Sequence, residues 1–475
     1  LTRIIEADPD GPGGPLTSPV SSFSYDKNGN VTRITDARGN STTYDYDSLD
    51  RRIHVTAAQI NQMSYSYDPA GNRVSVIDPL GRQTRTVFDT RNRVTETIAA
   101  DGGVTRFQYD ADNSLLQLID PVANVTRYLY DDRNRLQREI DPFGNEINYE
   151  YDLVDNLVNK SDRNGRITEF EYDDLDRLIG ETWLKPDEAI ANTITYAYDA
   201  ASNLVTTADA FSALAFTYDE RDRVTTVDNI GTPDVPNVVL DYDYDSFGNI
   251  VSVADTIGGQ PSATTMYAYE ARNRRTETQQ TGPATTDKRV DLSYNSIGQF
   301  VGINRFSDLL GTHLVVGSEY TFDSLNLLSN LTHRNALGDD LNFFMFEYDQ
   351  DSRITAITDV DGRNDYSYDG NDRLIGADHS DPGQPDETYA YDLNGNRESS
   401  HLHASYDTDT GNRLTSDGTF NYEYDDEGNL LRRTDISSGG MREFEWDHRN
   451  RLIAIVDSDS VGTDTQRVEF AYDVL

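Results

Sequence analysis

Residues 126–152 read TRYLYDDRNRLQREIDPFGNEINYEYD and contain one full period of a pattern that recurs along the chain. In 126–130, Thr and two Tyr residues alternate with other types, which places them on one face of an expected strand. The segments 131–135 and 141–145 are rich in Asp, Asn, Pro and Gly, the residues that turns require. Each period therefore predicts two short strands and two turns, that is, one β-hairpin.

An aromatic residue followed by Asp recurs every 21 residues in the first part of the chain. We interpret these pairs as structural anchors of successive repeats, because composition alone does not produce seven identical intervals. The anchors are Tyr25, Asp26, Tyr46, Asp47, Tyr67, Asp68, Phe88, Asp89, Tyr109, Asp110, Tyr130, Asp131, Tyr151, Asp152, Tyr172 and Asp173.

After residue 173 the anchors continue at looser intervals, which variable insertions explain. The further aromatic anchors are Tyr198, Tyr218, Tyr244, Tyr269, Tyr294, Phe322, Tyr348, Tyr368, Tyr391, Tyr406, Tyr424, Trp446 and Tyr472. We expect one continuous array over residues 1–475, with a partial leading repeat at 1–24, regular repeats at 25–173 and repeats with hairpin insertions at 174–475. Both ends fall inside a repeat, so we expect an excerpt of a longer protein.

The repeat Tyr-Asp-x-x-Gly-Asn-Arg, the Asp-x-x-Gly turn and the Thr-x-aromatic-x-Tyr-Asp strand resemble the YD repeat of the RHS family. Relatives in that family include the Tc-toxin C component and the teneurins, and the resemblance covers nearly the whole chain. It implies an all-β fold, a β-hairpin array wound into a spiral hollow shell or barrel. Strand number supports curling, since twisted open sheets rarely exceed about ten strands. A parallel β-helix is the alternative, and no segment predicts a substantial helix.

Composition excludes several classes of function. The 475 residues carry 83 Asp and Glu against 41 Lys and Arg, a net charge of −42, which argues against nucleic-acid binding. The chain has no Cys, so disulfides and thiolate chemistry are absent. No apolar run is long enough for a membrane span. Only 36% of residues are hydrophobic, which suits a single sheet layer hydrated on both faces.

Tyr and Arg recur at defined positions of the repeat. We expect each Tyr ring to pack on a neighbouring strand while its hydroxyl reaches water. We expect the recurrent Arg to bridge repeat Asp carboxylates or to stack on Tyr rings of an adjacent strand. These Arg residues are Arg73, Arg93, Arg135, Arg177, Arg223, Arg274, Arg373, Arg397, Arg413 and Arg451.

The sequence predicts no catalytic residue, no cofactor site and no metal site. The many Asp residues lie at turn positions, where turn formation accounts for them. The pair His401 and His403 has strand spacing but lacks a convincing third ligand for a metal. The run 241–245 places three Asp on one face but lacks the Gly and distal Glu of a calcium loop.

The insertions are the better candidates for specificity. Trp183 lies in one of them and is a candidate contact for a partner, which could be a protein, a carbohydrate or another domain. The insertion 309–316 is apolar and could project in the same way. The stretch 341–346, LNFFMF, is the most apolar part of the chain, and we expect it to face a core.

The leading hypothesis is a non-enzymatic structural shell of a large bacterial protein that encloses or carries a polypeptide such as a toxin. The resemblance implies that this protein is secreted or lies at the cell surface. The partners would be the enclosed polypeptide or adjoining domains of the same chain, and a cell-surface glycan or protein is a further option. A cell-surface adhesion or carbohydrate-binding module is the alternative function.

Overall fold

The computed structural model describes residues 1–9, 17–57, 61–283 and 285–474, and these residues form strands and turns without a helix. The chain folds into two compact units, each built from separate parts of the sequence. Unit 1 comprises Leu1–Arg93, Ile98–Asp101 and Leu240–Glu387, and unit 2 comprises Val94–Thr97, Gly102–Val239 and Thr388–Leu475.

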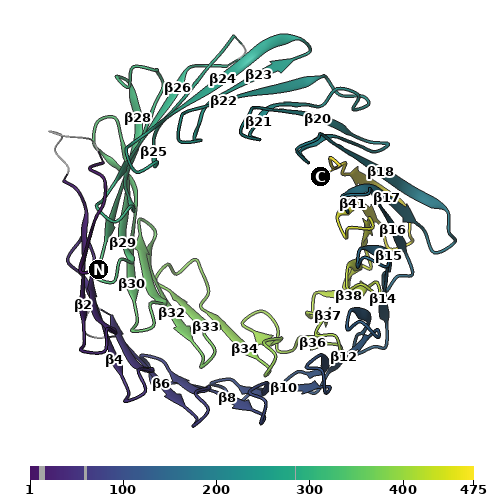
Figure 1. The fold of residues 1–475 in the computed structure, drawn as a ribbon, viewed down its shortest axis with the longest axis horizontal. Helices are drawn as coiled ribbons and strands as arrows, with labels where there is room; N and C mark the ends of the chain where they lie inside the picture. The colour runs from purple at the N-terminus through teal and green to yellow at the C-terminus, as the bar shows by residue number, and fades with distance from the viewer. Residues whose placement is uncertain (10–16, 58–60, 284, 475) are drawn as a thin grey trace. The chain divides into compact units, whose positions relative to one another are not determined.

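Unit 1 contains hairpins from the beginning and the middle of the chain (Figure 1). Its strands are β1 (Arg3–Ile5), β2 (Val20–Tyr25), β3 (Val31–Thr35), β4 (Ser41–Tyr46), β5 (Arg52–Ala57), β6 (Asn61–Tyr67), β7 (Arg73–Ile77), β8 (Gln83–Phe88), β23 (Ile250–Ile257), β24 (Gln260–Tyr269), β25 (Arg275–Thr281), β26 (Lys288–Tyr294), β27 (Phe300–Phe306), β28 (Leu314–Phe322), β29 (Leu328–Asn335), β30 (Asp340–Tyr348), β31 (Ile354–Asp359), β32 (Gly362–Tyr368) and β33 (Leu374–His379).

Unit 2 contains the regular hairpins that follow and the C-terminal hairpins. Its strands are β10 (Val104–Tyr109), β11 (Leu115–Ile119), β12 (Val125–Tyr130), β13 (Leu136–Ile140), β14 (Glu146–Tyr151), β15 (Leu157–Ser161), β16 (Ile167–Tyr172), β17 (Leu178–Leu184), β18 (Ile190–Tyr198), β19 (Leu204–Ala208), β20 (Ala213–Tyr218), β21 (Val224–Asp228), β35 (Arg397–Ser400), β36 (Asp407–Thr408), β37 (Leu414–Ser416), β38 (Phe420–Tyr424), β39 (Leu430–Asp435), β40 (Met441–Trp446), β41 (Leu452–Ser458) and β42 (Asp464–Glu469). Three strands contribute residues to both units: β9 (Val94–Ile98), β22 (Val238–Tyr244) and β34 (Glu387–Tyr391).

Within each unit, every described register joins a strand to the next one in sequence, and the pairs are antiparallel. In β12 and β13, for example, Arg127 pairs with Ile140 and Leu129 with Arg138. The register then shifts, so that Tyr130 pairs with Leu136 across a bulge. Sequential antiparallel hairpins are what the repeat predicts, and they exclude the parallel β-helix for the paired strands that the structure describes.

The first turn of each repeat, which we call the YD turn, begins at the Asp of the anchor pair. At Asp131 the backbone N–H bonds to the carbonyl of Arg135 at 3.0 Å, and the N–H of Asn134 bonds back to the Asp131 carbonyl at 2.9 Å. Asp131 Oδ1 accepts the N–H groups of Arg133 and Arg135, both at 2.9 Å. Asn134 has φ 64°, a conformation that Gly, Asn and Asp adopt more readily than other residues, and these three types fill most of the corresponding positions.

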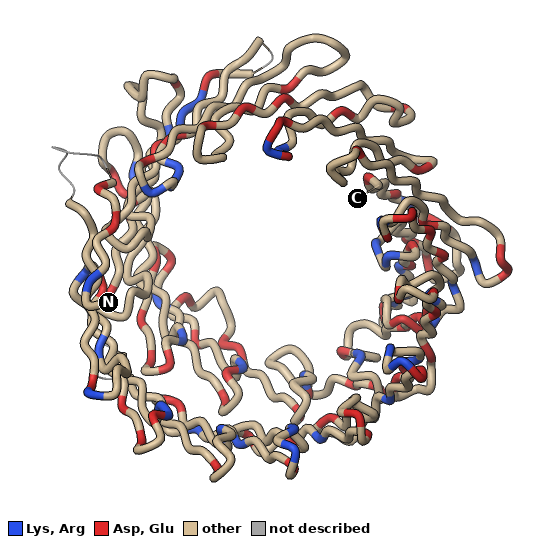
Figure 2. Tube along the Cα trace, viewed as in Figure 1, with Lys and Arg blue, Asp and Glu red and all other residues tan. Residues whose placement is uncertain are grey.

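The second turn of the repeat has the same design. Asp141 Oδ1 accepts the N–H of Phe143 at 2.9 Å and that of Asn145 at 2.8 Å, and Gly144 has φ 92°. In this repeat the same Asp-centred turn therefore lies at both ends of the hairpin. Acidic residues accordingly recur at the ends of the hairpins in both units (Figure 2).

The sheet has little dry interior. Among the described residues only eight hydrophobic side chains are buried, and half-exposed residues line both faces of most strands. In β16 the exposed residues Glu169 and Glu171 alternate with half-buried ones. This pattern agrees with the expectation of a single layer that is hydrated on both faces.

Candidate functional site

The aromatic anchors end strands and bind the preceding hairpin. Tyr25, Tyr46, Tyr67, Phe88, Tyr109, Tyr130, Tyr151 and Tyr172 are the last residues of β2, β4, β6, β8, β10, β12, β14 and β16. The hydroxyl of Tyr151 donates to the carbonyl of Leu136 at 2.9 Å, and that of Tyr172 donates to the carbonyl of Leu157 at 3.0 Å. These hydroxyls therefore donate to backbone carbonyls of the preceding strand, a contact that the expectation did not include.

The Asp anchors organise the YD turns and are not free carboxylates. The backbone N–H of Arg135, followed by its guanidinium, holds the pKa of Asp131 below its usual value. At Asp47 the guanidinium of Arg51 lowers the pKa most, followed by the backbone N–H of the same residue. The same turn begins at Asp26, Asp68, Asp89, Asp110, Asp152 and Asp173. A carboxylate committed to three or four such bonds is a structural group.

The recurrent Arg joins neighbouring repeats, as predicted. Nε of Arg135 bonds to Asp131 at 2.8 Å, its Nη1 donates to the carbonyl of Asp152 at 3.0 Å, and the guanidinium lies 4.6 Å from the Tyr151 ring. Both a bond to the Asp of its own turn and stacking on the ring of the next repeat are confirmed at Arg135, Arg177, Arg274, Arg413 and Arg451; at Arg274 the acid is Glu270.

Arg73 and Arg397 occupy a different position from the other recurrent Arg residues. They follow an Asn that fills the fourth position after the turn Asp, and each stacks on a ring of its own hairpin, Tyr65 at 5.5 Å and Tyr389 at 4.6 Å. The sequence pattern Asn-Arg or Asp-Arg therefore combines two structural roles.

In each unit, second turns from an early part of the chain contact YD turns from a much later part. We call this set of contacts the seam. In unit 1, Arg38 Nη1 donates to Asn326 Oδ1 at 2.6 Å and Arg82 Nη1 to Asp372 Oδ1 at 2.6 Å. In unit 2, Arg166 donates to the carbonyl of Asp447 at 2.6 Å and to Asn450 Oδ1 at 2.8 Å.

The residues joined across the seam are separated by 261 to 292 positions in the sequence. This narrow range means that the ribbon of hairpins returns to itself after a nearly fixed length. The seam was not predicted from the sequence. Its signal in the sequence is Asn or Arg within the second turns, for example Arg38, Asn124 and Arg166.

Trp183 lies in an apolar cluster of unit 2, where it is 4% exposed. The cluster contains Ile194 and Val474 and borders Tyr196 and Leu214. The Trp183 ring stacks on His448 with centroids 5.3 Å apart and 12° between the planes. Because His448 belongs to the YD turn between β40 and β41, Trp183 fixes the long hairpin β17–β18 to the C-terminal hairpins.

Polar contacts surround this stack. Nε2 of His448 donates to the carbonyl of Leu184 at 2.8 Å, so the ring holds a proton on that nitrogen. Burial lowers the pKa of His448 below its ordinary value, and the bond to Leu184 opposes the shift. Arg449 bonds to Glu181 Oε2 at 3.0 Å and to the Tyr196 hydroxyl at 3.2 Å.

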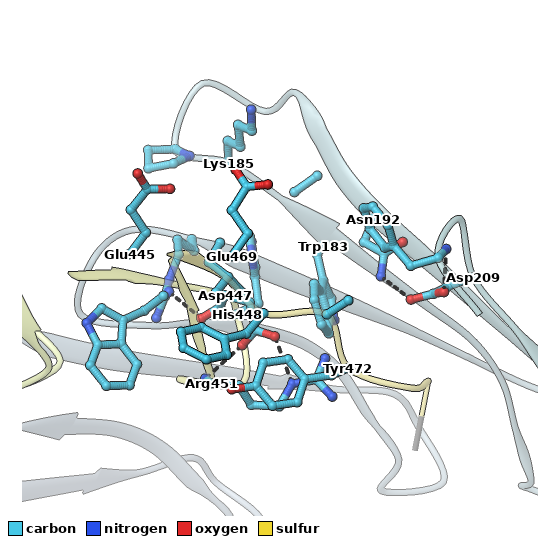
Figure 3. A pocket seen from close by; sticks show the side chains of 18 of the residues that line it. Trp183, Lys185, Asn192, Asp209, Glu445, Asp447, His448, Arg451, Glu469 and Tyr472 are labelled. Carbon is cyan, nitrogen blue, oxygen red and sulfur yellow. Dashed lines mark hydrogen bonds and ion pairs between the residues drawn. The ribbon is translucent and has the colours of Figure 1, made fainter. Parts of the chain in front are cut away.

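A pocket of about 610 Å³ opens beside Trp183, between the β17–β18 hairpin and strands β40–β42 (Figure 3). One wall carries Lys185, Asn192 and Asp209, and the other carries Glu445 and Glu469. This volume is in the range of pockets that hold small ligands. The partner-contact role of Trp183 stays a prediction. Because Trp183 itself is buried, the accessible surface at this place belongs to the residues around it.

The structure does not bring His401 and His403 together as a metal site. His401 lies edge-on to Tyr389, whereas Nε2 of His403 is 2.9 Å from the Thr419 hydroxyl. Within the described residues, no group of three or more His, Asp or Glu side chains is arranged to hold a metal ion, and the run 241–245 is included in that statement. No described helix could serve as a membrane span, because the described residues form strands and turns.

The apolar stretch 341–346 does not face a core as expected, whereas the apolar insertion 309–316 projects as expected. The stretch 341–346 lies in β30 and does not form a core, because alternate side chains point to opposite faces of the strand. Leu341 and Met345 are 52% and 51% exposed. In the insertion 309–316, Leu310 is 82% exposed at a turn, as a projecting loop requires.

Comparison with known families and structures identifies the fold. The teneurin YD-shell family matches residues 18–183 and 235–475, so the chain belongs to this family and has its all-β YD-shell fold, built from sequential antiparallel β-hairpins. The YD-repeat resemblance seen in the sequence is thereby confirmed.

Solved structures agree with this assignment. The chain is similar to TcdB2-TccC3-Cdc42, with 16% identity, a TM-score of 0.72 and coverage of 97% of this chain and 29% of that one. It is also similar to TcdB2-TccC3 without its hypervariable C-terminal region, with 15% identity, a TM-score of 0.65 and coverage of 98% and 31%.

A third similar structure is the Photorhabdus luminescens Tc holotoxin pore, with 15% identity, a TM-score of 0.64 and coverage of 98% and 31%. The chain thus spans less than a third of the length of these solved chains. The comparison with curated protein sequences gave no match.

Proposed function

We propose that residues 1–475 form a continuous, non-enzymatic wall of a shell that encloses a polypeptide. The observation that carries the proposal is the seam, which joins hairpins 261 to 292 residues apart in both units. A ribbon that returns to itself and bonds turn to turn makes a continuous barrier. Its half-exposed faces suit a hydrated interior rather than a packed core.

The non-enzymatic role rests on how the carboxylates are used. Asp residues that could act as acids or bases are held by turn N–H groups and by Arg, which lower their pKa, as at Asp131 and Asp173. Such groups stay ionised and oriented for structure, whereas a general acid needs a raised pKa. No cofactor is part of the proposal.

We place the enclosed polypeptide, or adjoining domains of the same chain, as the main partner. The toxin assemblies that share the fold support a secreted or surface-exposed bacterial protein with a toxin as cargo. The alternative, adhesion or carbohydrate binding at a cell surface, has one observation in its favour, the pocket beside Trp183.

Protease protection tests enclosure. The protein in its natural length is digested with proteinase K, and surviving peptides are identified by mass spectrometry. We expect a polypeptide without YD repeats to survive in the wild type and to be digested in the double variant Arg82→Ala, Arg166→Ala, which opens the seam in each unit. Equal digestion rates in the two proteins would contradict enclosure.

A further inference from the structure

One position of the repeat changes its residue type in two successive repeats of unit 1. The first residue after the YD turn begins a strand, and in most of the regular repeats it is a half-buried Val or Leu. In the repeats spaced by 21 residues this position is occupied by Val31, Arg52, Arg73, Val94, Leu115, Leu136, Leu157 and Leu178. The two Arg residues are neighbours in this series, and both are exposed. Packing within the sheet does not call for such a pair.

Each of these two guanidinium groups stacks on a tyrosine of its own hairpin. Arg52 lies 4.7 Å from the centre of the Tyr44 ring, and Arg73 lies 5.5 Å from the centre of the Tyr65 ring. Within the part of the chain that the structure describes, neither guanidinium forms an ion pair or a hydrogen bond. Stacking occupies the flat face of a guanidinium, whereas its N–H donors point outward in the plane of the group. Both groups are therefore oriented and keep their donors for a ligand.

The two Arg residues line one pocket of about 320 Å³, which we call the arginine pocket. Its lining consists of Tyr46, Asp50, Arg52, Tyr65, Tyr67 and Arg73. The strand registers place Arg52 opposite Tyr46 and Arg73 opposite Tyr67, on the same face of β4–β7. An Arg stacks on the rings of Tyr65 and Tyr67, which leaves Tyr46 as the uncovered ring of the lining.

The lining of the arginine pocket is positively charged, although the chain as a whole carries a net charge of −42. Two Arg residues stand against one acidic residue, Asp50. Oδ1 of Asp50 is already bonded to the amides of Asn28 and Asn30, at 2.8 Å and 2.7 Å. Salt screens exposed charges that lie more than about 8 Å apart, so an anion in the pocket interacts mainly with these near groups. The arginine pocket therefore favours an anionic ligand.

The spacing of the two Arg residues limits the kind of anion. Arg52 begins β5 and Arg73 begins β7, so they are two strands apart. Neighbouring strands lie about 4.8 Å apart, which separates equivalent side chains of the two repeats by about 10 Å. A polyproline II segment rises about 3.1 Å per residue with about three residues per turn, so side chains three positions apart project from one side at a spacing of about 9 Å. Carboxylates at every third position of such a segment match the two guanidinium groups.

We propose that the arginine pocket binds an acidic peptide in the polyproline II conformation, with carboxylates three residues apart. Each carboxylate accepts hydrogen bonds from the N–H donors of one Arg, and prolines between the carboxylates pack on the ring of Tyr46. The seam contacts of unit 1 are made by second turns and leave this end of the hairpins open. The inference does not depend on enclosure, because the arginine pocket lies within unit 1.

The test is titration calorimetry of the whole chain with the peptide Gly-Glu-Pro-Pro-Glu-Gly, acetylated and amidated at its ends. We expect binding, and at least about tenfold weaker binding in the double variant Arg52→Val, Arg73→Val. Val occupies the same position in the repeats on either side, so this variant should fold. Thermal unfolding at or above the wild-type temperature would show that it does.

Arg275→Val is the matched control. Arg275 holds the same position in another repeat of unit 1 and stacks on Tyr267 at 5.5 Å, but the repeats on either side carry Ile250 and Phe300 there. This variant should bind the peptide as the wild type does, and the peptide Gly-Gln-Pro-Pro-Gln-Gly should bind at least about tenfold more weakly than its Glu counterpart.

The proposal is overturned if the Glu peptide does not bind, if the Gln peptide binds equally well, or if the double variant binds unchanged. An equal loss of binding in Arg275→Val would also overturn it, because the effect would then not belong to the arginine pocket. Binding of inorganic tripolyphosphate without binding of the Glu peptide would assign the pocket to phosphate groups and overturn the assignment to a peptide.

Discussion

Arg135 and Arg166 occupy the same place in the same kind of turn, but they join the fold in different directions. Nε of each bonds to the turn Asp four residues earlier, at 2.8 Å and 2.6 Å. Arg135 then reaches the carbonyl of Asp152, 17 residues away, in the next repeat. Arg166 reaches the carbonyl of Asp447, 281 residues away, across the seam.

The difference lies in which end of the hairpin carries the turn. The YD turn at Asp131 bonds to the next repeat, to which the backbone ladder already joins it, as between β13 and β14. The second turn that ends at Arg166 faces a hairpin far away in the sequence. Its contacts to that hairpin are made by side chains and turn backbone and not by a strand ladder. The same turn motif therefore stabilises both the sheet and the seam. Because no backbone ladder joins the two sides of the seam, each side chain contributes more to its stability than it does within the sheet.

The apolar contact between Trp183 and His448, which lies beside the seam, should give the largest effect. Trp183→Ala removes a ring that is 4% exposed and its stack on His448. Large-to-small changes of this kind cost about 3–5 kcal/mol, so we expect the urea midpoint of unit 2 to fall sharply. Phe247→Ala, which removes an exposed ring, should leave the midpoint nearly unchanged. Similar midpoints for the two variants would contradict the role of Trp183.

The second prediction compares the two Arg residues directly. Arg166→Ala removes charged hydrogen bonds across the seam, each worth about 1.5–3 kcal/mol, and should lower the urea midpoint clearly. Arg135→Ala should lower it less, because the ladders of β13 continue to join the neighbouring repeats. If the Arg135 variant were the less stable of the two, the distinction between ladder and seam would be wrong.

The third prediction concerns the hydroxyl of an anchor. Tyr151→Phe removes the bond to the Leu136 carbonyl and should cost about 1 kcal/mol in the free energy of unfolding. Phe88 is the natural counterpart, an anchor with a ring and no hydroxyl. The reverse variant Phe88→Tyr should therefore raise stability by a similar amount. Equal stability of all three proteins would show that the ring alone acts as the anchor.

The smallest expected effect is a pH dependence at the seam. Burial lowers the pKa of His448 below its ordinary value of 6.5, so the unfolded chain takes up a proton before the folded chain does. The stability contributed by the neutral ring is complete above that pH and declines as the pH falls below it. Thermal unfolding measured between pH 7.5 and about pH 5 checks this dependence. The charged groups that act on the His448 ring are Arg166, Asp162 and Asp447.

His448→Gln is the control for this pH dependence. Since Gln does not titrate, the decline below pH 6.5 should be smaller in this variant. A decline of the same size in wild type and variant would assign it to other groups, such as the turn carboxylates.

Much of the fold follows from the sequence because the repeat is local. The alternating run 126–130 predicts β12 except for its first residue, Val125. The turn residues at 131–135 and 141–145 adopt the hydrogen-bonded turns that their composition requires. The alternation of a strand and the residue types of a turn are local properties that involve only a few residues. The amino-acid sequence alone therefore predicts where the strands and turns lie.

The seam and the pocket could not be predicted in the same way. Which distant turns meet depends on the curvature accumulated over more than ten hairpins, and each strand contributes only slightly to it. Trp183 was recognised as part of an insertion, but its burial depends on His448, 265 positions later in the sequence. The bonds of the Tyr hydroxyls to carbonyls, such as that of Tyr151 to Leu136, also depend on the register of paired strands, which the residue pattern does not show.

A single cross-link tests the return of the ribbon most directly, since the chain contains no Cys. Asn164 Oδ1 accepts the N–H of Asp426 at 3.0 Å, so the pair Asn164→Cys, Asp426→Cys should form a disulfide under mild oxidation. In the control pair Asn164→Cys, Ser437→Cys, the second Cys lies beyond β39, about 20 Å further along at ~3.3 Å per residue. We predict faster migration on a non-reducing gel for the first pair alone; no cross-link in it, or equal cross-linking in both, would contradict the seam.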